Sequence, residues 1–252
     1  MNRNLILALF LQLTSTPIFA EDKPNMSQEP VENQSVVDVT GTKNADWKSY
    51  SAMLKGITAF NEHHKLAPKS ELRFILRKQL PNAEMQGIVL RIVGTEKSIS
   101  VPIAEDGTFS LLVDKNLAED NAELVLNRKK DMVRWLPHII TPNLPENVRR
   151  LGDLRLECEV RWAVEKEGMS FFQRNSFKAL GGPCSSSVIK TDFYVPKLAV
   201  SAKITFGSQT AEVQVAKTGA RFTPPLYDKN WNDDALIEFQ FKGDSQPVSS
   251  SQ

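Results

Sequence analysis

Hydrophobic positions recur with two different periods along this chain of 252 residues. In residues 46–64, apolar side chains return at intervals of three and four, which places them on one stripe of a helix. The stripe consists of Trp47, Tyr50, Leu54, Ile57 and Phe60. Gly56 weakens this predicted helix by up to ~1 kcal/mol. From residue 72 onward the period changes to two, which is typical of strands with one buried face.

Short alternating runs fill most of the first half after the helix. The run at residues 72–76 alternates leucine and phenylalanine with arginine, and Asp106-Gly107 is a turn signal within the series. Further strands are predicted at residues 88–92, 99–103, 109–113 and 124–126. Several short strands separated by Gly, Pro, Asn and Asp predict a β-sandwich or a barrel.

A proline-rich stretch interrupts this pattern at residues 135–153. It carries Pro137, Pro142 and Pro145 and has no regular hydrophobic period. Because proline has no backbone N–H and disfavours the interior of a sheet, we expect a boundary or an ordered crossover here. We therefore place a connection between two β units at residues 141–153.

The second half opens with the most regular alternation in the chain, at residues 154–162. Its apolar members are Leu154, Leu156, Cys158, Val160 and Trp162, and its charged members are Arg155, Glu157, Glu159 and Arg161. Five consecutive alternations predict a strand whose apolar face is buried. We expect a short helix at residues 170–180 to follow. Further strands are predicted at residues 188–195, 198–206, 211–215 and 235–241, with a polar loop at residues 228–234.

These elements predict a mainly β fold. It consists of two β-sandwich-like units, with the N-terminal amphipathic helix packed on the first. The helix and the first unit span residues 45–140, and the second unit spans residues 154–242. The two units form either one large domain or two small ones.

The chain begins with the three-part pattern of a secretory signal peptide. Asn2 and Arg3 give a small positive region, an apolar run follows, and residues 14–20 carry a proline and end in Ala20. We expect cleavage after Ala20, which removes residues 1–20 and places the protein in the periplasm or outside the cell. The alternative is an uncleaved membrane anchor, although the apolar run is short for a span that needs roughly 20 apolar residues.

Two further segments lack the large apolar residues that a core requires. Residues 21–44 are rich in Pro, Gln, Asn, Ser and charge, and residues 243–252 end in a serine-rich run. Such compositions cannot bury enough surface to offset the entropy of ordering. We therefore expect a disordered leader and a disordered tail, and no transmembrane segment in the mature chain.

The chain has two cysteines, Cys158 and Cys184. In an oxidising compartment two cysteines usually pair, and the flexible sequence Gly181-Gly182-Pro183 can bring Cys184 across to Cys158. We predict a structural disulfide, which the chain-entropy model values at roughly 3–4 kcal/mol. The alternatives are a redox site and an intermolecular bridge, but the CxxC spacing of redox sites is absent.

Charge is balanced over the whole chain, with 31 basic and 30 acidic residues and a formal net charge of +1. This balance gives no support to binding of nucleic acid or of anionic lipid. Arg149, Arg150, Arg155 and Arg161 nevertheless cluster near the start of the second unit. We expect a solvated or subunit-facing ionic surface there, with contact to an anionic glycan or a partner as the alternative. Trp231 is a further candidate binding residue.

Two groups of residues resemble parts of metal sites. His63 and His64 are adjacent, and neighbours on a helix diverge by about 100°, so these two cannot face one ion together. The loop at residues 228–234 holds three aspartates, but it lacks the central Gly and the distal Glu of an EF-hand calcium loop. We therefore predict no metal site and no cofactor. We expect the loop to be a turn that Trp231 anchors to the core.

The turn at Asp106-Gly107, followed by Phe109, resembles a step in transthyretin-like and carboxypeptidase-regulatory-like β-sandwich modules. In those modules a D-G-x-F sequence closes a strand turn and buries the Phe. The resemblance implies a sandwich at residues 72–128, under a quarter of the chain, and implies no activity. The whole chain is similar in style to secreted or periplasmic proteins of proteobacteria that have no characterised activity.

The sequence contains no GxSxG motif, P-loop or dinucleotide fingerprint. The predicted signal peptide and the mainly β fold come without any recognisable set of catalytic residues. We therefore expect a non-catalytic binding or scaffolding module of the cell envelope. Its partner would be an envelope protein or a glycan, and not a nucleic acid. The alternative is an envelope hydrolase acting on a glycan or a peptide, which paired carboxylates in a cleft or a carboxylate of raised pKa would favour.

Overall fold

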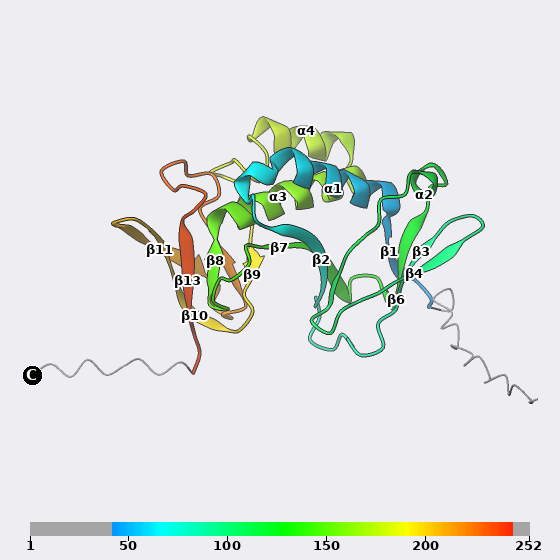
Figure 1. Ribbon diagram of the computed structural model, residues 1–252, viewed down its shortest axis with the longest axis horizontal. Helices are drawn as coiled ribbons and strands as arrows, with labels where there is room; N and C mark the ends of the chain where they lie inside the picture. The colour runs from blue at the N-terminus through cyan, green and yellow to red at the C-terminus, as the bar shows by residue number, and fades with distance from the viewer. Residues whose placement is uncertain (1–41, 244–252) are drawn as a thin grey trace, which may run out of the picture. The chain divides into compact units, whose positions relative to one another are not determined.

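The computed structural model describes residues 42–243 of the chain. The predicted signal peptide, the predicted leader up to residue 41 and the predicted tail from residue 244 lie outside the described residues. The described part is mainly β, as the sequence predicts, and its strands form three antiparallel sheets (Figure 1).

Two of the sheets come from the N-terminal half. The four-stranded sheet has the order β1 (Ala45–Ser49), β6 (Glu123–Lys129), β3 (Leu90–Val93), β4 (Ser98–Val101). The three-stranded sheet has the order β5 (Thr108–Phe109), β2 (Glu71–Lys78), β7 (Val133–Ile140). Each predicted strand of this half therefore overlaps an observed one.

The third sheet is six-stranded and comes from the C-terminal half. Its order is β8 (Val148–Arg150), β13 (Leu236–Phe241), β10 (Ala199–Phe206), β11 (Gln209–Val215), β12 (Arg221–Thr223), β9 (Phe193–Tyr194). β10 pairs antiparallel with both β11 and β13, and exposed and buried residues alternate along β13. The strands predicted at 198–206 and 235–241 are therefore confirmed.

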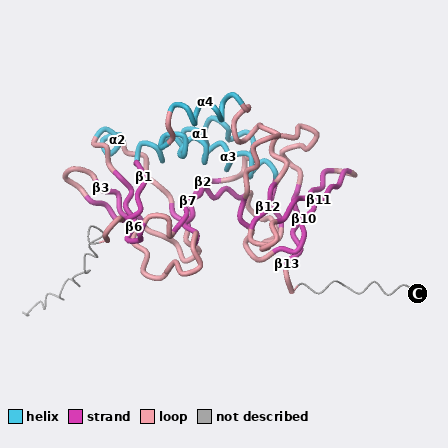
Figure 2. Tube along the Cα trace, turned by 180° about the vertical axis from the view of Figure 1, so that it is seen from behind, coloured by secondary structure: helices cyan, strands magenta, loops and turns pink. Residues whose placement is uncertain are grey.

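The helices lie together on one side of the strands (Figures 1 and 2). They are α1 (Tyr50–His63), α2 (Lys115–Glu119), α3 (Leu151–Glu165) and α4 (Phe171–Ala179), with short 3₁₀ turns at η2 (His64–Leu66) and η3 (Lys166–Gly168). Ser49 caps α1, because its hydroxyl accepts a hydrogen bond from the N–H of Ala52. Residues 46–49, which the periodicity assigns to the helix, instead belong to strand β1.

The strand predicted at residues 154–162 is wrong, because this segment forms helix α3. Leu156 and Val160 pack in the core of the N-terminal half, whereas Leu154 and Cys158 pack in the core of the C-terminal half. A helix that is buried on opposite sides does not need one apolar stripe. The alternation is therefore compatible with a helix whose charged residues are buried as well.

Helix α1 runs alongside α3 at close range (Figure 1). A Cβ atom at Gly56 would lie 2.6 Å from Cγ2 of Val164 and 3.4 Å from Cγ1 of Val160. Real Cβ atoms do not approach other carbons this closely, so a larger residue would push the two helices apart. The glycine that weakens the predicted helix thus permits its packing.

Two strands, β7 and β8, lie within the proline-rich stretch where the sequence predicts a boundary or an ordered crossover. β7 is the edge strand of its sheet, and Pro137 faces Phe74 of β2 in the pairing register. Proline is tolerated on an edge strand when its nitrogen points away from the neighbouring strand. The N–H groups of Ile139 and Thr141, two and four residues on, point to α3, so the nitrogen of Pro137 is on the same outer edge.

Side chains of α3 complete the free edge of β7. Glu157 accepts a hydrogen bond from the N–H of Ile139 at 2.7 Å, and Asp153 accepts one from the N–H of Thr141 at 2.7 Å. Arg149 donates to the carbonyl of Ile139 at 3.2 Å and to Glu157 at 2.9 Å. Backbone groups that would otherwise be buried without partners are thereby satisfied.

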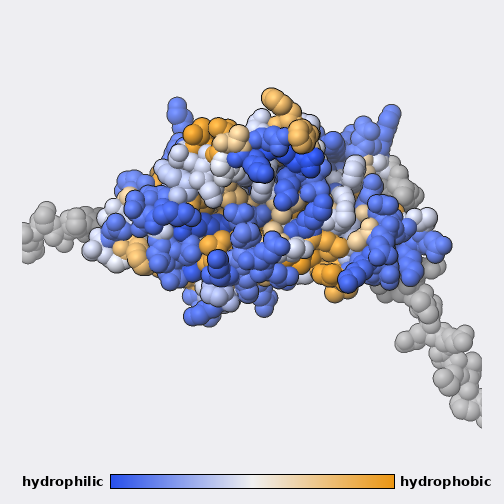
Figure 3. All heavy atoms as spheres, turned by 90° about the horizontal axis from the view of Figure 1, so that it is seen from above, coloured by the Kyte–Doolittle hydropathy of each residue, from blue (hydrophilic) through white to orange (hydrophobic). Residues whose placement is uncertain are grey.

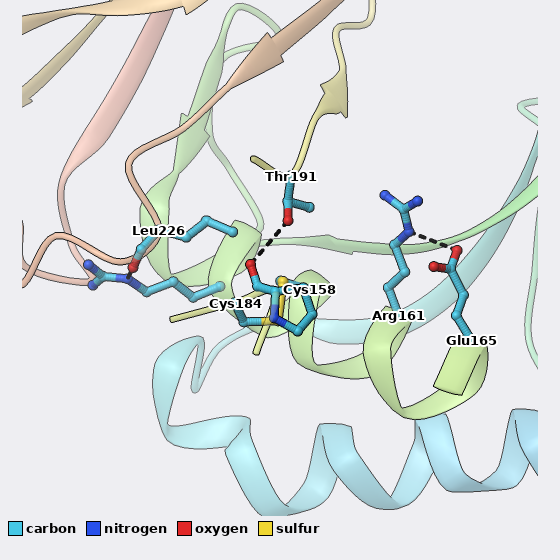
Figure 4. Close-up of a disulfide and its surroundings, with 8 residues drawn as sticks. Cys158, Arg161, Glu165, Cys184, Thr191 and Leu226 are labelled. Atoms are coloured by element: carbon cyan, nitrogen blue, oxygen red, sulfur yellow. Dashed lines mark hydrogen bonds and ion pairs between the residues drawn. A yellow bond between two sulfur atoms is a disulfide. The ribbon is translucent and has the colours of Figure 1, made fainter. Parts of the chain in front are cut away.

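Cys158 and Cys184 form the predicted disulfide, with their Cα atoms 5.6 Å apart. It joins α3 to the segment that follows α4 (Figure 4). Thr191 donates to the carbonyl of Pro183, next to Cys184, at 3.1 Å. The disulfide closes a loop between two cysteines that are 26 positions apart in the sequence.

We expect Glu157→Gln to lower the free energy of unfolding by about 3–5 kcal/mol, because it leaves the buried Arg149 without its counter-charge. The matched control is Glu165→Gln on the same helix. Glu165 pairs with Arg161 at a partly exposed position, so this change should cost under ~1 kcal/mol. Urea unfolding measures both values, and equal losses would contradict a structural role for the buried pair.

We expect the double variant Cys158→Ser/Cys184→Ser to lose about 3–4 kcal/mol of unfolding free energy, because the open loop restores entropy to the unfolded chain. Urea unfolding with and without a thiol reductant checks this. The reductant should destabilise the native protein and leave the double variant unchanged. A native protein that is equally stable in both conditions would refute the prediction.

Candidate functional site

Like charges face each other on one side of the β2–β7 pair. Arg77 lies directly opposite Arg134 in the register, and Arg73 lies opposite His138. The opposite side of the pair, which includes Phe74, packs in the core. Like charges directly across two strands destabilise a sheet. In the described range 42–243, neither Arg77 nor Arg134 forms an ion pair.

Two adjoining pockets lie over this charged face. They share Arg161, Asp192 and Tyr194 in their walls, and the larger one has a volume of about 330 Å³. Six basic and three acidic side chains line the two: Arg77, Arg134, Arg149, Arg161, Lys190 and Arg221, against Glu157, Glu165 and Asp192. The walls therefore carry an excess of positive charge.

The acidic side chains of the pocket walls already have partners. Glu157 accepts from Arg149, Glu165 accepts from Arg161 at 2.9 Å (Figure 4), and Asp192 accepts from the hydroxyl of Thr223 at 2.6 Å. These contacts do not reach Arg77 or Arg134. The buried Nε atoms of Arg134 and Arg149 are without a hydrogen-bond partner among the described residues. Buried donors of this kind are rarely left unmatched.

The pKa of His138 is lowered by its burial and by the positive charges around it. Burial, followed by the charges of Arg149 and Arg77, lowers the pKa of its imidazole to about 4. Burial also lowers the pKa of the Arg77 guanidinium, and Arg149 lowers it further. His138 is therefore neutral at pH 7, in an environment that resists a further positive charge.

Aromatic side chains form a further part of the walls of the two pockets. The guanidinium of Arg221 lies 4.9 Å from the ring centre of Tyr194 and donates to its hydroxyl at 3.0 Å. Trp162 and Phe177 also line the larger pocket, with their ring centres 5.2 Å apart. The site thus combines unmatched cations with flat apolar surfaces, a combination suited to binding a small organic anion.

Three of the four arginines singled out in the sequence are structural. Arg155 is buried, and its guanidinium donates to the carbonyls of Leu226, Asp228 and Trp231 and to Asp233. Arg150 donates to Asp234 and to the carbonyl of Leu66, and Arg149 binds the edge of β7. The expectation of a solvated ionic surface is therefore wrong for these three. They hold loops and strand edges onto α3.

The remaining candidates lie in different places. Arg161 lines both pockets and pairs with Glu165. Trp231 packs against the C-terminal core, and its carbonyl accepts from Arg155. As expected, Trp231 anchors the polar loop at residues 228–234. Of the sequence candidates, Arg149 and Arg161 line the two adjoining pockets over the β2–β7 pair, and Trp231 does not.

Sequence reasoning missed Arg77, Arg134, His138 and Tyr194. A signal for the first was present, since Arg73 and Arg77 stand at polar positions of the run that begins at residue 72. The pairing register that sets Arg77 against Arg134 could not be read from the sequence, because β7 was not predicted as a strand. No group of three or more His, Cys, Asp or Glu residues in the described part is arranged to hold a metal ion.

Comparisons with protein-family models, with curated proteins and with solved structures found no match to this chain. The resemblance to transthyretin-like and carboxypeptidase-regulatory-like modules therefore stays a prediction. Within residues 42–243, no helix is long and apolar enough to cross a membrane.

Proposed function

We propose that this protein is a non-catalytic binding module of the cell envelope, and that it binds an anionic ligand in the two adjoining pockets over the β2–β7 pair, together called the arginine-lined pocket. The observation that carries the proposal is the opposition of Arg77 and Arg134 across β2 and β7, where neither guanidinium forms an ion pair within the described part of the chain. A bound anion would relieve the repulsion between them. Guanidinium groups bind carboxylates and phosphates through paired hydrogen bonds.

The surroundings of the arginine pair support a small anionic ligand. Arg134 lines the larger pocket, which at about 330 Å³ is of the size that small-molecule ligands occupy, and Arg77 lines the smaller pocket that adjoins it. The aromatic wall of the larger pocket, Trp162 and Phe177, suits a sugar ring or another flat group attached to the anion. An acidic glycan of the envelope has both features. The proposed location is the periplasm or the extracellular medium, on the strength of the predicted signal peptide.

An envelope hydrolase is the second candidate. The observation in its favour is Glu157, a pocket-wall carboxyl whose pKa is raised by burial. Its Oε1 atom, however, already accepts hydrogen bonds from Ile139 and Arg149, which favours the structural role. Turnover of peptidoglycan by the native protein, lost in a folded Glu157→Gln variant, would support the hydrolase instead of the binding module.

We expect inorganic phosphate and glucuronate to bind the native protein and to raise the pKa of His138 from about 4 toward 6.5. The sign follows because a nearby anion stabilises the protonated imidazole. NMR titration of the histidine ring protons between pH 8 and pH 5 measures this, with His138→Gln to assign the signal. Without the anion, His138 should stay neutral over this range.

The double variant Arg77→Gln/Arg134→Gln should weaken anion binding at least tenfold, as measured by calorimetry. It should also stabilise the ligand-free protein by about 0.2–1 kcal/mol, because the opposed charges are gone. Arg174→Gln/Lys178→Gln removes the same charge from exposed positions outside the pocket and should leave binding unchanged. If both double variants bind the two anions as the native protein does, the pocket is not the binding site.

A further inference from the structure

A second hollow with basic walls, which we call the basic groove, lies next to the arginine-lined pocket, between α3 and α4. Trp162 and Lys166 form one wall, and Arg174, Lys178 and the turn at residues 181–182 form the other. The groove has a volume of about 400 Å³ and shares Trp162 with the larger of the two pockets. On the face of the molecule that carries the helices, hydrophobic residues lie next to strongly hydrophilic ones (Figure 3).

The walls of the basic groove carry three cations and no acid. None of the three, Lys166, Arg174 and Lys178, forms an ion pair within residues 42–243. The two glutamates that flank Lys166 in the sequence pair with other cations. Residues 168–191 contain no Asp or Glu. Cations that gather in a hollow without acids raise the local concentration of anions there.

Helix α4 directs two of these cations to the groove. Phe177 is the residue of α4 that packs on Trp162, with the two ring centres 5.2 Å apart. At about 100° per residue, Arg174 and Lys178 lie roughly 60° and 100° around the helix axis from Phe177, on the same flank of the helix. Both are exposed residues, and they line the groove beside the contact between α4 and α3.

The wall formed by α4 is fixed in place by a covalent bond and by hydrogen bonds. The N–H of Gly182 donates to the carbonyl of Phe177 at 2.8 Å, and the left-handed φ of 78° at Gly182 is typical of the end of a helix. The Cys158–Cys184 disulfide then ties the chain just beyond this turn to α3. A wall that is already ordered reduces the entropy that is lost when a ligand binds.

Trp162 stands between the cations of the basic groove and those of the arginine-lined pocket. Lys166 follows Trp162 by four residues, about 40° around the helix axis, and lines the groove. Arg161 precedes Trp162 by one residue, about 100° in the other direction, and lines both pockets over the β2–β7 pair. An indole ring with cations on both sides suits a sugar ring that connects two anionic groups.

We infer that the arginine-lined pocket and the basic groove together bind one linear acidic oligosaccharide, which places a carboxylate in each and a sugar ring against Trp162. The inference rests on the proposed function, because it gives the ligand of the pocket a second anionic group and a place for it. Exposed cations hold a lone anion only weakly in water. A second anion on a chain that is already held in the pocket binds at a high effective concentration, so the groove contributes only to a ligand with several charges.

Two other classes of linear polyanion fit the observations less well. A polyphosphate has no ring to place against Trp162 and Phe177, which both line the larger pocket. Proteins that bind single-stranded nucleic acid do so along an extended basic surface, and the net charge of this chain is only +1. An acidic oligosaccharide has both rings and separated charges along one chain.

The test is calorimetry of the native protein with glucuronate, which has one carboxylate, and with trigalacturonate, a linear trimer that has three. The trimer should bind at least tenfold more tightly than glucuronate, and high salt should reduce this difference. Maltotriose, a neutral trimer, should bind at least tenfold more weakly than trigalacturonate. Equal affinities for glucuronate and trigalacturonate would overturn the inference and leave the proposed function standing.

Arg174→Gln/Lys178→Gln should lower the affinity for trigalacturonate at least fivefold and leave the affinity for glucuronate unchanged. The matched control is Lys129→Gln/Lys130→Gln, which removes two exposed cations that line neither the pocket nor the groove and should bind both ligands as the native protein does. An unchanged unfolding midpoint confirms that each variant is folded. Native affinity for trigalacturonate in the α4 variant would overturn the inference.

Arg77→Gln/Arg134→Gln should weaken the binding of both glucuronate and trigalacturonate, because the trimer is held in the pocket as well as in the groove. Trimer binding at native affinity in this variant would overturn a ligand that spans both. Failure of glucuronate and phosphate to bind the native protein would instead overturn the proposed function itself. Tripolyphosphate or a thymidine trinucleotide that binds as tightly as trigalacturonate, with the same loss in Arg174→Gln/Lys178→Gln, would overturn the assignment to an acidic glycan.

Discussion

The fold depends on hydrogen bonds between the carboxylates of α3 and the free edge of β7. Glu157 and Asp153, four residues apart on the helix, accept from the N–H groups of Ile139 and Thr141, two residues apart on the strand. Four helical residues rise about 6 Å and two strand residues about 6.6 Å, so the two spacings match. The helix thereby takes the place of a neighbouring strand. Arg149 balances the buried charge of Glu157.

Because α3 is fixed to β7 in this way, it can serve as the shared wall of two cores. Leu156 and Val160 belong to the core under α1, and Leu151, Leu154 and Cys158 belong to the core over the six-stranded sheet. Gly56 lets α1 approach α3 closely. The disulfide and the guanidinium of Arg155 then fix the segment after α4 and the loop at residues 228–234 to the same helix.

The local pattern of hydrophobic residues predicted most of the strands. It failed for segments whose secondary structure depends on contacts with distant parts of the chain. The turn at Asp106-Gly107 and the buried Phe109 are as expected, because side-chain hydrogen bonds of Asp106 and a positive φ at Gly107 are local. The strand prediction for α3 failed because burial on two sides removes the apolar stripe. β7 was missed because a proline on an edge strand cannot be distinguished by sequence from a proline in a loop.

Tertiary contacts, and not local sequence, also separate the arginines that stabilise the fold from the arginines of the candidate site. Arg149, Arg150 and Arg155 look like a surface cluster in the sequence, yet each donates hydrogen bonds to carboxylates or carbonyls of the fold, and among their buried donor atoms only the Nε of Arg149 is without a partner in the described residues. Arg77 and Arg134 come from different strands and meet only through the pairing register. An arginine whose donors are satisfied internally stabilises the protein, whereas one set directly opposite another arginine lowers the stability of the sheet. The unmatched pair is therefore the part of this charged network that a folding role does not explain.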